Sequence, residues 1–221
     1  VFAAHDPEPH RRMLDRFLIL AELQDLPIVI GIAKMDTDSA ERQPRPREIF
    51  ADYEAVYEVH YFSSYSGEGV EELRAVLDGK LTVLAGPSGV GKSSLLNVLD
   101  PENRREVSHV STATGKGRHT TVGARLQQID DTTFLGDTPG MRALAMRAVH
   151  ADQLAGCFRE FLPYLGDCHF DDCSHVHEPS CAIRDAVGDG RIARGRYESY
   201  VGLRSGGELD DSGIVKISAD V

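Results

Sequence analysis

The sequence lacks several features that would assign it to whole classes of protein. No run of apolar residues approaches the roughly 20 that span a bilayer as a helix, and the first residues show no signal-peptide pattern. Basic residues are in deficit, because 24 Lys and Arg stand against 35 Asp and Glu and the net charge is −11. We therefore expect a soluble, cytoplasmic protein with no membrane partner, whose surface as a whole does not attract nucleic acid.

Positive charge is nevertheless gathered in a few places. Each cluster is open to two interpretations, a contact with RNA or an ordinary solvated loop or helix face. The clusters are Arg104-Arg105 with Lys116-Gly-Arg118, and a predicted helix that carries Arg191, Arg194 and Arg196.

Cysteine is also scarce, with four residues in the chain. In a cytoplasmic protein such cysteines indicate a metal site before they indicate disulfides. Four potential ligands lie within fourteen residues: Cys168, Cys173, His175 and Cys181. Three thiolates and one imidazole suit a structural Zn²⁺ site. Buried thiols beside surface histidines are the alternative, and His169 or His177 could stand in for His175. We expect Cys157, on the apolar face of a helix, to be a core residue.

With 221 residues the chain can form one well-buried core and a small second domain. We predict a first domain over 1–150, a helical domain over 151–204, and a disordered tail over 205–221 that could contain a short strand near Ile214. The stretch Val1-Phe-Ala-Ala4 is typical of the end of a buried strand. We therefore expect a further N-terminal portion to precede it.

The central motif is Gly86-Pro-Ser-Gly-Val-Gly-Lys-Ser93, which follows an apolar run at 80–85 and precedes a helix-compatible run at 94–99. A strand, G-x-x-x-x-G-K-S and a helix in this order are typical of a phosphate-binding loop. The glycines let successive N–H groups face one point, and the helix directs its positive end there. A glycine-rich turn with a chance Lys-Ser is the alternative. The motif predicts a nucleoside triphosphate site, with Lys92 at the β- and γ-phosphates and Ser93 on Mg²⁺.

The apolar pattern predicts alternating strands and helices, which is an α/β fold. The expected strands are 27–33, 57–62, 80–85, 122–129 and 132–135, and the expected helices are 10–23, 48–56, 70–77, 154–162, 182–187 and 192–203.

Three further motifs stand at the ends of predicted strands, where open α/β sheets bind their ligands. Asp137-Thr-Pro-Gly140 matches the D-x-x-G element that serves Mg²⁺ and the γ-phosphate, although such a tetrapeptide is often only a turn. Ala33-Lys-Met-Asp36 resembles the guanine-recognition element N-K-x-D, and Ser63-Ser-Tyr-Ser66 resembles its companion loop, which offers a backbone N–H to guanine O6. Together with the phosphate-binding loop, the three motifs indicate guanine nucleotides.

The order of the motifs is permuted, because the base-recognition pair precedes the phosphate-binding loop. This order resembles the circularly permuted GTPases. Together with Thr114-Gly-Lys-Gly-Arg-His-Thr-Thr121 and the cluster ending in Cys181-Ala-Ile-Arg-Asp-Ala-Val187, it resembles the RsgA-type small-ribosomal-subunit biogenesis GTPases over residues 1 to 203. The resemblance implies a phosphate-loop NTPase fold, a missing OB-fold domain, structural Zn²⁺ on Cys168, Cys173, His175 and Cys181, and Mg²⁺ with GTP. It also implies hydrolysis of GTP under stimulation by the 30S subunit during its late maturation. We expect the partner to be the 30S subunit with its 16S rRNA, and the protein to be a monomer.

Two positions depart from the usual GTPase pattern. Ala33 replaces the Asn whose amide bonds guanine N7, a loss of about 1 to 3 kcal/mol. Met141 stands where many GTPases have the Gln that orients water, and the resemblance gives that task to His119, which is otherwise a solvent-exposed loop histidine. The alternatives in function are an ATPase or kinase, and a ribosome-binding module that nucleotide only stabilises.

The resemblance assigns the switch hydroxyl on Mg²⁺ to Thr120 or Thr121. The residues predicted to contact nucleotide are Ala33, Lys34, Met35, Asp36, Ser63, Ser64, Gly86, Pro87, Ser88, Gly89, Val90, Gly91, Lys92, Ser93, Ser94, Asp137 and Gly140, and those predicted for Mg²⁺ are Ser93, Thr120 and Asp137.

Overall fold

The computed structural model describes residues 1–39, 44–100, 125–137, 148–206 and 214–216. Contacts between Cα atoms group the chain into two compact units. Unit 1 contains residues 1–9, 29–49 and 58–141, and unit 2 contains residues 10–28, 50–57 and 142–221. The chain therefore enters unit 2 three times along its length.

The first sheet of unit 1 has three parallel strands in the order β1-β2-β3. β1 spans Phe2–Ala3, β2 spans Val29–Ala33 and β3 spans Glu58–Tyr61. β2 is part of the apolar run at 27–33, and its last four residues are buried, as its lack of polar alternation predicts. Since Ile32 pairs with Tyr61, the segments that follow these two strands leave the sheet at the same edge.

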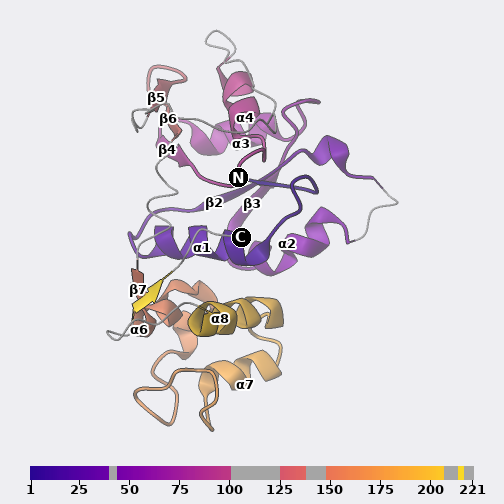
Figure 1. The fold of residues 1–221 in the computed structure, drawn as a ribbon. Helices are drawn as coiled ribbons and strands as arrows, with labels where there is room; N and C mark the ends of the chain where they lie inside the picture. The colour runs from indigo at the N-terminus through magenta and orange to yellow at the C-terminus, as the bar shows by residue number, and fades with distance from the viewer. Residues whose placement is uncertain (40–43, 101–124, 138–147, 207–213, 217–221) are drawn as a thin grey trace, which may run out of the picture. The chain divides into compact units, whose positions relative to one another are not determined.

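The second sheet of unit 1 has the order β4-β6-β5, with β6 parallel to β4 and antiparallel to β5. β4 spans Leu81–Leu84, β5 spans Arg125–Gln128 and β6 spans Phe134–Asp137. The glycine-rich loop follows β4, and α4 begins at its lysine and spans Lys92–Leu99. The predicted succession of strand, loop and helix is confirmed (Figure 1).

One apolar core holds unit 1 together and joins side chains from both sheets to the helices α3 (Val70–Leu77) and α4. α3 starts directly after Gly69, whose φ is 68° and where a Cβ atom would lie 2.1 Å from the carbonyl oxygen of Tyr61. Only glycine fits that approach. The buried members of the core are Ala33, Phe62, Val70, Leu73, Leu77, Leu84, Leu95, Leu96, Leu99 and Leu135. The short helix η1 (Met35–Thr37) follows β2, and α2 spans Pro46–Glu54.

Unit 2 is mostly helical. Its elements are α1 (Arg11–Glu22), β7 (Ala148–His150), α6 (Ala151–Leu154), η2 (Ala155–Cys157), η3 (Arg159–Tyr164), α7 (Ala182–Gly188), α8 (Arg194–Gly206) and β8 (Ile214–Lys216). Its core contains stacked and edge-on aromatic rings of Phe158, Phe161 and Tyr200, and Ile19 of α1 packs into the same cluster. Cys157 is buried there, which confirms it as a core residue.

An ion cluster is buried in unit 2 and links α8 to α1. The side chain of Arg196 is 1% exposed and pairs with Asp15, which is 0% exposed, and with Glu160, at 2.6 Å from Nε. Ser199 also donates to the Asp15 carboxylate. Burial alone would lower the pKa of Arg196, but the charges of Asp15 and Glu160 raise it, so the guanidinium stays charged.

Burial of Arg196 corrects one interpretation of the sequence. The sequence places this arginine in a basic cluster with Arg191 and Arg194 that could contact RNA. Its guanidinium is instead enclosed by two carboxylates and by the ring faces of Tyr53 and Phe158. A charge buried in this way does not reach a phosphate backbone.

Of two other expectations for the C-terminal part, one is wrong and one is confirmed. The prediction of a single helix at 154–162 is wrong, because the chain there forms α6 and two 3-10 helices, η2 and η3, the second with Pro163 inside it. The short strand expected near Ile214 is confirmed as β8, which pairs antiparallel with β7. Residues 207–213 and 217–221 of the expected tail lie outside the described residues.

The predicted domain boundary near residue 150 does not coincide with the division by contacts. α1 and the segment 50–57 precede that boundary but belong to unit 2 with the C-terminal helices. The boundary itself stays a prediction. In the described part of the chain, no helix combines the length and the apolar character needed to cross a membrane.

Candidate nucleotide site and metal cluster

The glycine-rich loop has the backbone form that a phosphate-binding loop requires. Gly86, Gly89 and Gly91 all have positive φ, at 147°, 79° and 107°. Side-chain-bearing residues rarely adopt this region, so the glycines make the curl of the loop possible. Lys92 folds back over the loop, and its Nζ donates to the carbonyl oxygens of Gly86 at 2.8 Å and Pro87 at 2.6 Å. The ammonium group is thereby held above the loop.

The base-recognition segment at the end of β2 is fixed by its companion loop. Ser63 donates from Oγ to Asp36 Oδ1 at 2.5 Å, and the same oxygen accepts from the backbone N–H groups of Tyr65 and Ser66 at 3.1 Å. The hydroxyl of Ser63 therefore donates one hydrogen bond and accepts two within the protein. Asp36 remains exposed, so its second carboxylate oxygen can accept from a ligand.

A cavity of about 390 Å³ joins these parts in unit 1. The base-recognition segment, the companion loop and the phosphate-binding loop all contribute to its wall. The lining residues are Ala33, Lys34, Asp36, Thr37, Ser64, Tyr65, Gly91 and Ser94. Two of them, Thr37 and Tyr65, were not predicted from the sequence, although Tyr65 lies inside the companion-loop motif and is 91% exposed.

Of the other predicted site residues, some are described by the structure, Asp137 only through its backbone, and some lie outside the described residues. β6 ends at Asp137, which pairs in register with Leu84 at the end of β4, so its backbone lies beside the start of the phosphate-binding loop. Pro87, Ser88, Val90 and Ser93 lie in or directly after that loop. His119, Thr120, Thr121, Gly140 and Met141 lie outside the described residues, so their roles stay predictions.

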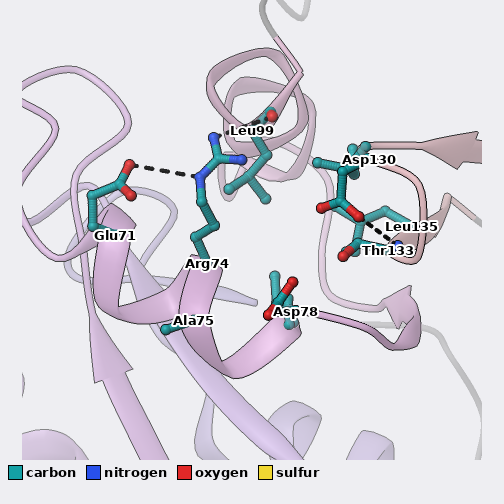
Figure 2. Close-up of a pocket in the computed structure, with 10 residues that line it drawn as sticks. Glu71, Arg74, Ala75, Asp78, Leu99, Asp130, Thr133 and Leu135 are labelled. Atoms are coloured by element: carbon teal, nitrogen blue, oxygen red, sulfur yellow. Dashed lines mark hydrogen bonds and ion pairs between the residues drawn. The ribbon is translucent and has the colours of Figure 1, made fainter.

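A second cavity in unit 1, of about 240 Å³, lies at the other end of α4 (Figure 2). Arg74 of α3 crosses it, pairs with Glu71 at 3.6 Å and donates to the carbonyl oxygen of Leu99 at 3.2 Å. The turn between β5 and β6 closes one side, where Asp130 accepts from the N–H of Thr133 at 2.9 Å. None of the residues predicted for nucleotide lines this cavity.

The predicted metal ligands converge in unit 2. One potential ligand atom from each of Cys168, Cys173, His175 and Cys181 lies within 4.8 Å of the others. Nδ1 of His175 is 3.5 Å from Sγ of Cys168 and 3.5 Å from Sγ of Cys181. Of the three histidines left open by the sequence, His175 is the one in the cluster.

The chemistry of the four groups fits a divalent cation. Burial raises the pKa of the Cys173 thiol to about 12 and lowers the pKa of His175. A bound cation would supply the positive charge that favours thiolates at the cluster. Three soft sulfurs and one neutral imidazole form the donor set that tetrahedral zinc prefers.

The loop that carries these ligands is tied down on both sides of its backbone. Glu178 accepts from the N–H of Ser174 at 3.0 Å. The carbonyl oxygens of Ser174 and His175 accept from the hydroxyls of Tyr200 and Tyr197, both at 2.8 Å. Since α8 supplies both tyrosines, packing of α8 positions the imidazole of the cluster.

The strand, curled glycine loop, lysine and adjoining base cavity define a phosphate-loop nucleotide-binding protein. The profile of the RsgA GTPase family matches residues 1–147. The chain belongs to the RsgA GTPase family.

Relatives with curated names are similar over most of this chain. The Small ribosomal subunit biogenesis GTPase RsgA of Gemmatimonas aurantiaca is 49% identical over 205 residues, which cover 92% of this chain and 66% of the relative. The protein of the same name from Thermotoga maritima is 42% identical, covering 88% of this chain and 65% of the relative. The chain thus spans slightly less than two thirds of these relatives.

Two solved structures share the fold. The crystal structure of YjeQ from Thermotoga maritima matches with a TM-score of 0.74 and 39% identity, covering 89% of this chain and 66% of that one. The structure of YloQ, described as a circularly permuted GTPase, matches with a TM-score of 0.68 and 30% identity, covering 90% and 63%. The predicted fold class, an α/β phosphate-loop fold with permuted motif order, is confirmed.

Proposed function

We propose that this chain binds GTP and hydrolyses it to GDP and phosphate in late maturation of the 30S ribosomal subunit. The observation that carries the proposal is the single cavity whose wall joins the base-recognition segment to the phosphate-binding loop. The names of the curated relatives, as small ribosomal subunit biogenesis GTPases, support the ribosomal part. On this proposal the protein acts in the cytoplasm as a monomer, and its partner is the 30S subunit with its 16S rRNA.

On this proposal, different residues bind the base, the phosphates and Mg²⁺. Asp36, oriented by Ser63, accepts from N1 and N2 of guanine, and the stem of Lys34 packs on the base. Loop N–H groups and Lys92 hold the phosphates, and Ser93, Thr120 and Asp137 serve Mg²⁺, which neutralises charge on the phosphates. His119 orients the attacking water. A zinc ion on the four clustered ligands stabilises the helical part.

The test is phosphate release by the purified chain with and without 30S subunits. We expect slow hydrolysis alone and faster hydrolysis with 30S, because a partner can complete a site in which Met141 replaces the usual Gln. Competition between GTP and ATP for the site separates this proposal from an ATPase or kinase, which Ala33 alone favours. Binding of GTP to the chain with no turnover on 30S particles would instead favour a nucleotide-stabilised ribosome-binding module.

A further inference from the structure

The base-recognition turn, which comprises residues 34–38 and contains Asp36, has a strained backbone at its start. Lys34 has a φ of 63° and a ψ of 36°, in the left-handed region that residues other than glycine rarely adopt. Such a conformation persists only where surrounding contacts hold it. Ala33, directly before the turn, presents only a methyl group and so offers no side-chain hydrogen bond. Contacts from elsewhere in unit 1 must therefore hold the turn.

Asp38 anchors the end of the base-recognition turn. Its Oδ1 lies 2.9 Å from Nε2 of His5, and its Oδ2 accepts from Nη2 of Arg45 at 2.5 Å. The hydrogen bond from His5 and the charge of Arg45 lower the pKa of the Asp38 carboxyl, so it stays ionised. An ionised carboxylate only accepts, and Nε2 of His5 is therefore the donor. The side chains of Asp38 and His5 are 7% and 10% exposed, so little water competes for their bond.

The segment that contains His5 also holds the start of the base-recognition turn. Nζ of Lys34 donates to the carbonyl oxygen of Asp6 at 2.6 Å. The backbone N–H of Ala4 donates to the carbonyl oxygen of Ala33 at 2.8 Å, directly before the turn. Three consecutive residues after β1 therefore contact both ends of the turn. None of them belongs to a motif that the sequence assigns to nucleotide.

We propose that His5 and Arg45, acting through Asp38, are positioning residues for the recognition of guanine. They fix the base-recognition turn in the form in which the Asp36 carboxylate accepts from N1 and N2 of the base. The inference rests on the proposed function, since it takes a guanine nucleotide as the occupant of the cavity beside Asp36. His5 and Arg45 are not among the residues that line this cavity, so they act on the turn and not on the ligand.

The test is the variant His5→Ala, measured by calorimetry with GDP and with inosine diphosphate (IDP). The base of IDP lacks the exocyclic N2 group, so the ratio of the GDP affinity to the IDP affinity reports the bond between N2 and Asp36. We expect this ratio to fall roughly three- to tenfold, because a displaced Asp36 loses the net gain of that bond. A merely structural histidine would lower the unfolding temperature and leave the ratio unchanged. Arg45→Met should lower the ratio less, since the Arg45 side chain is 41% exposed.

Two matched variants separate positioning from a general loss of stability. His5→Gln should restore most of the ratio, because its side-chain amide can also donate to Asp38. His60→Ala is the control, since His60 forms a second histidine–carboxylate pair in unit 1, with Nε2 at 2.8 Å from Oε1 of Glu58 on β3, and the ratio should not change.

The outcomes distinguish this inference from the proposed function. Equal ratios in His5→Ala and in the unmodified chain would overturn the inference and leave the proposed function intact. An unmodified chain that binds GDP and IDP equally would also overturn it, since Asp36 would then not recognise N2. Failure of the unmodified chain to bind GDP would overturn both.

Discussion

At the residue scale, the ammonium group of Lys92 has acceptors within the loop itself, which the phosphate oxygens of a bound nucleotide would replace. Its Nζ donates to the carbonyl oxygens of Gly86 and Pro87. A phosphate oxygen is a stronger acceptor than a carbonyl oxygen because it is charged. The lysine therefore moves only from one set of acceptors to a better one, and its charge stays directed at the phosphates.

Replacement of Lys92 by Ala should weaken GTP binding at least tenfold, or ~1.4 kcal/mol, because it removes a positive charge placed for the β- and γ-phosphates. Calorimetry with GTP measures the loss. Lys80→Ala is the matched control, since Lys80 lies at the other end of β4 and its Nζ donates to the carbonyl oxygen of Val76. Unchanged affinity in Lys92→Ala would remove the phosphate-binding loop from the proposed site.

His119→Ala tests the assignment of catalysis. GTP affinity should stay within about twofold, and 30S-stimulated turnover should fall by ~10²-fold or more, the usual effect of losing a group that positions water. Single-turnover hydrolysis on 30S subunits is the measurement, and Met141→Ala should do much less. The same rate in His119→Ala and in the unmodified chain would give the water to another residue or to the ribosome.

At the scale of elements, local pattern predicted much of the site. The glycine-rich loop, the strand before it, the helix after it and the ligand spacing of the metal cluster are all signalled by neighbours in the chain, and all are found. The apolar pattern predicted a helix less well where glycine and proline, several residues apart, both interrupt it. The helix expected at 154–162 is divided, with Gly156 inside η2 and Pro163 inside η3, because glycine and proline both disfavour a continuous α-helix.

Removal of the metal should act on the helical elements around the cluster. Chelation should release close to one Zn²⁺ per chain and lower the unfolding temperature, because structural zinc is coupled to the folding of its own module. Metal analysis and circular dichroism check both parts. Cys168→Ala should lose the metal, whereas Cys157→Ala should keep it, since Cys157 lies in the core and outside the cluster. Protein purified without chelator and found free of zinc would contradict this assignment.

At the scale of the whole molecule, the features that the sequence did not predict are contacts between distant residues. Asp15 and Arg196 are 181 positions apart, and neither sits in a motif that announces the other. From the sequence alone, Asp15 is assigned to the polar, exposed face of an amphipathic helix. Its burial becomes apparent only when its partner Arg196 is known.

Arg196→Met should destabilise the protein by about 3 to 5 kcal/mol, because it leaves Asp15 buried without its cation. Chemical denaturation followed by circular dichroism measures the change. Arg194→Met, at an exposed position on the same helix, is the control and should be nearly neutral. A chain cut after residue 150 would also lose Arg196 and Ser199, so its α1 should be unstable. A well-folded truncated chain would show that the predicted domain boundary describes an independent domain.

The separation of Asp15 from Arg196 also has a consequence during synthesis. At ~5 to 20 residues per second, the 181 positions between them take roughly 9 to 36 s to translate. Throughout that interval Asp15 of α1 has been made, but its partner Arg196 of α8 has not. We therefore expect α1 to reach its native contacts only after α8 has left the ribosome that made the chain. Until then we expect a chaperone to bind the exposed α1.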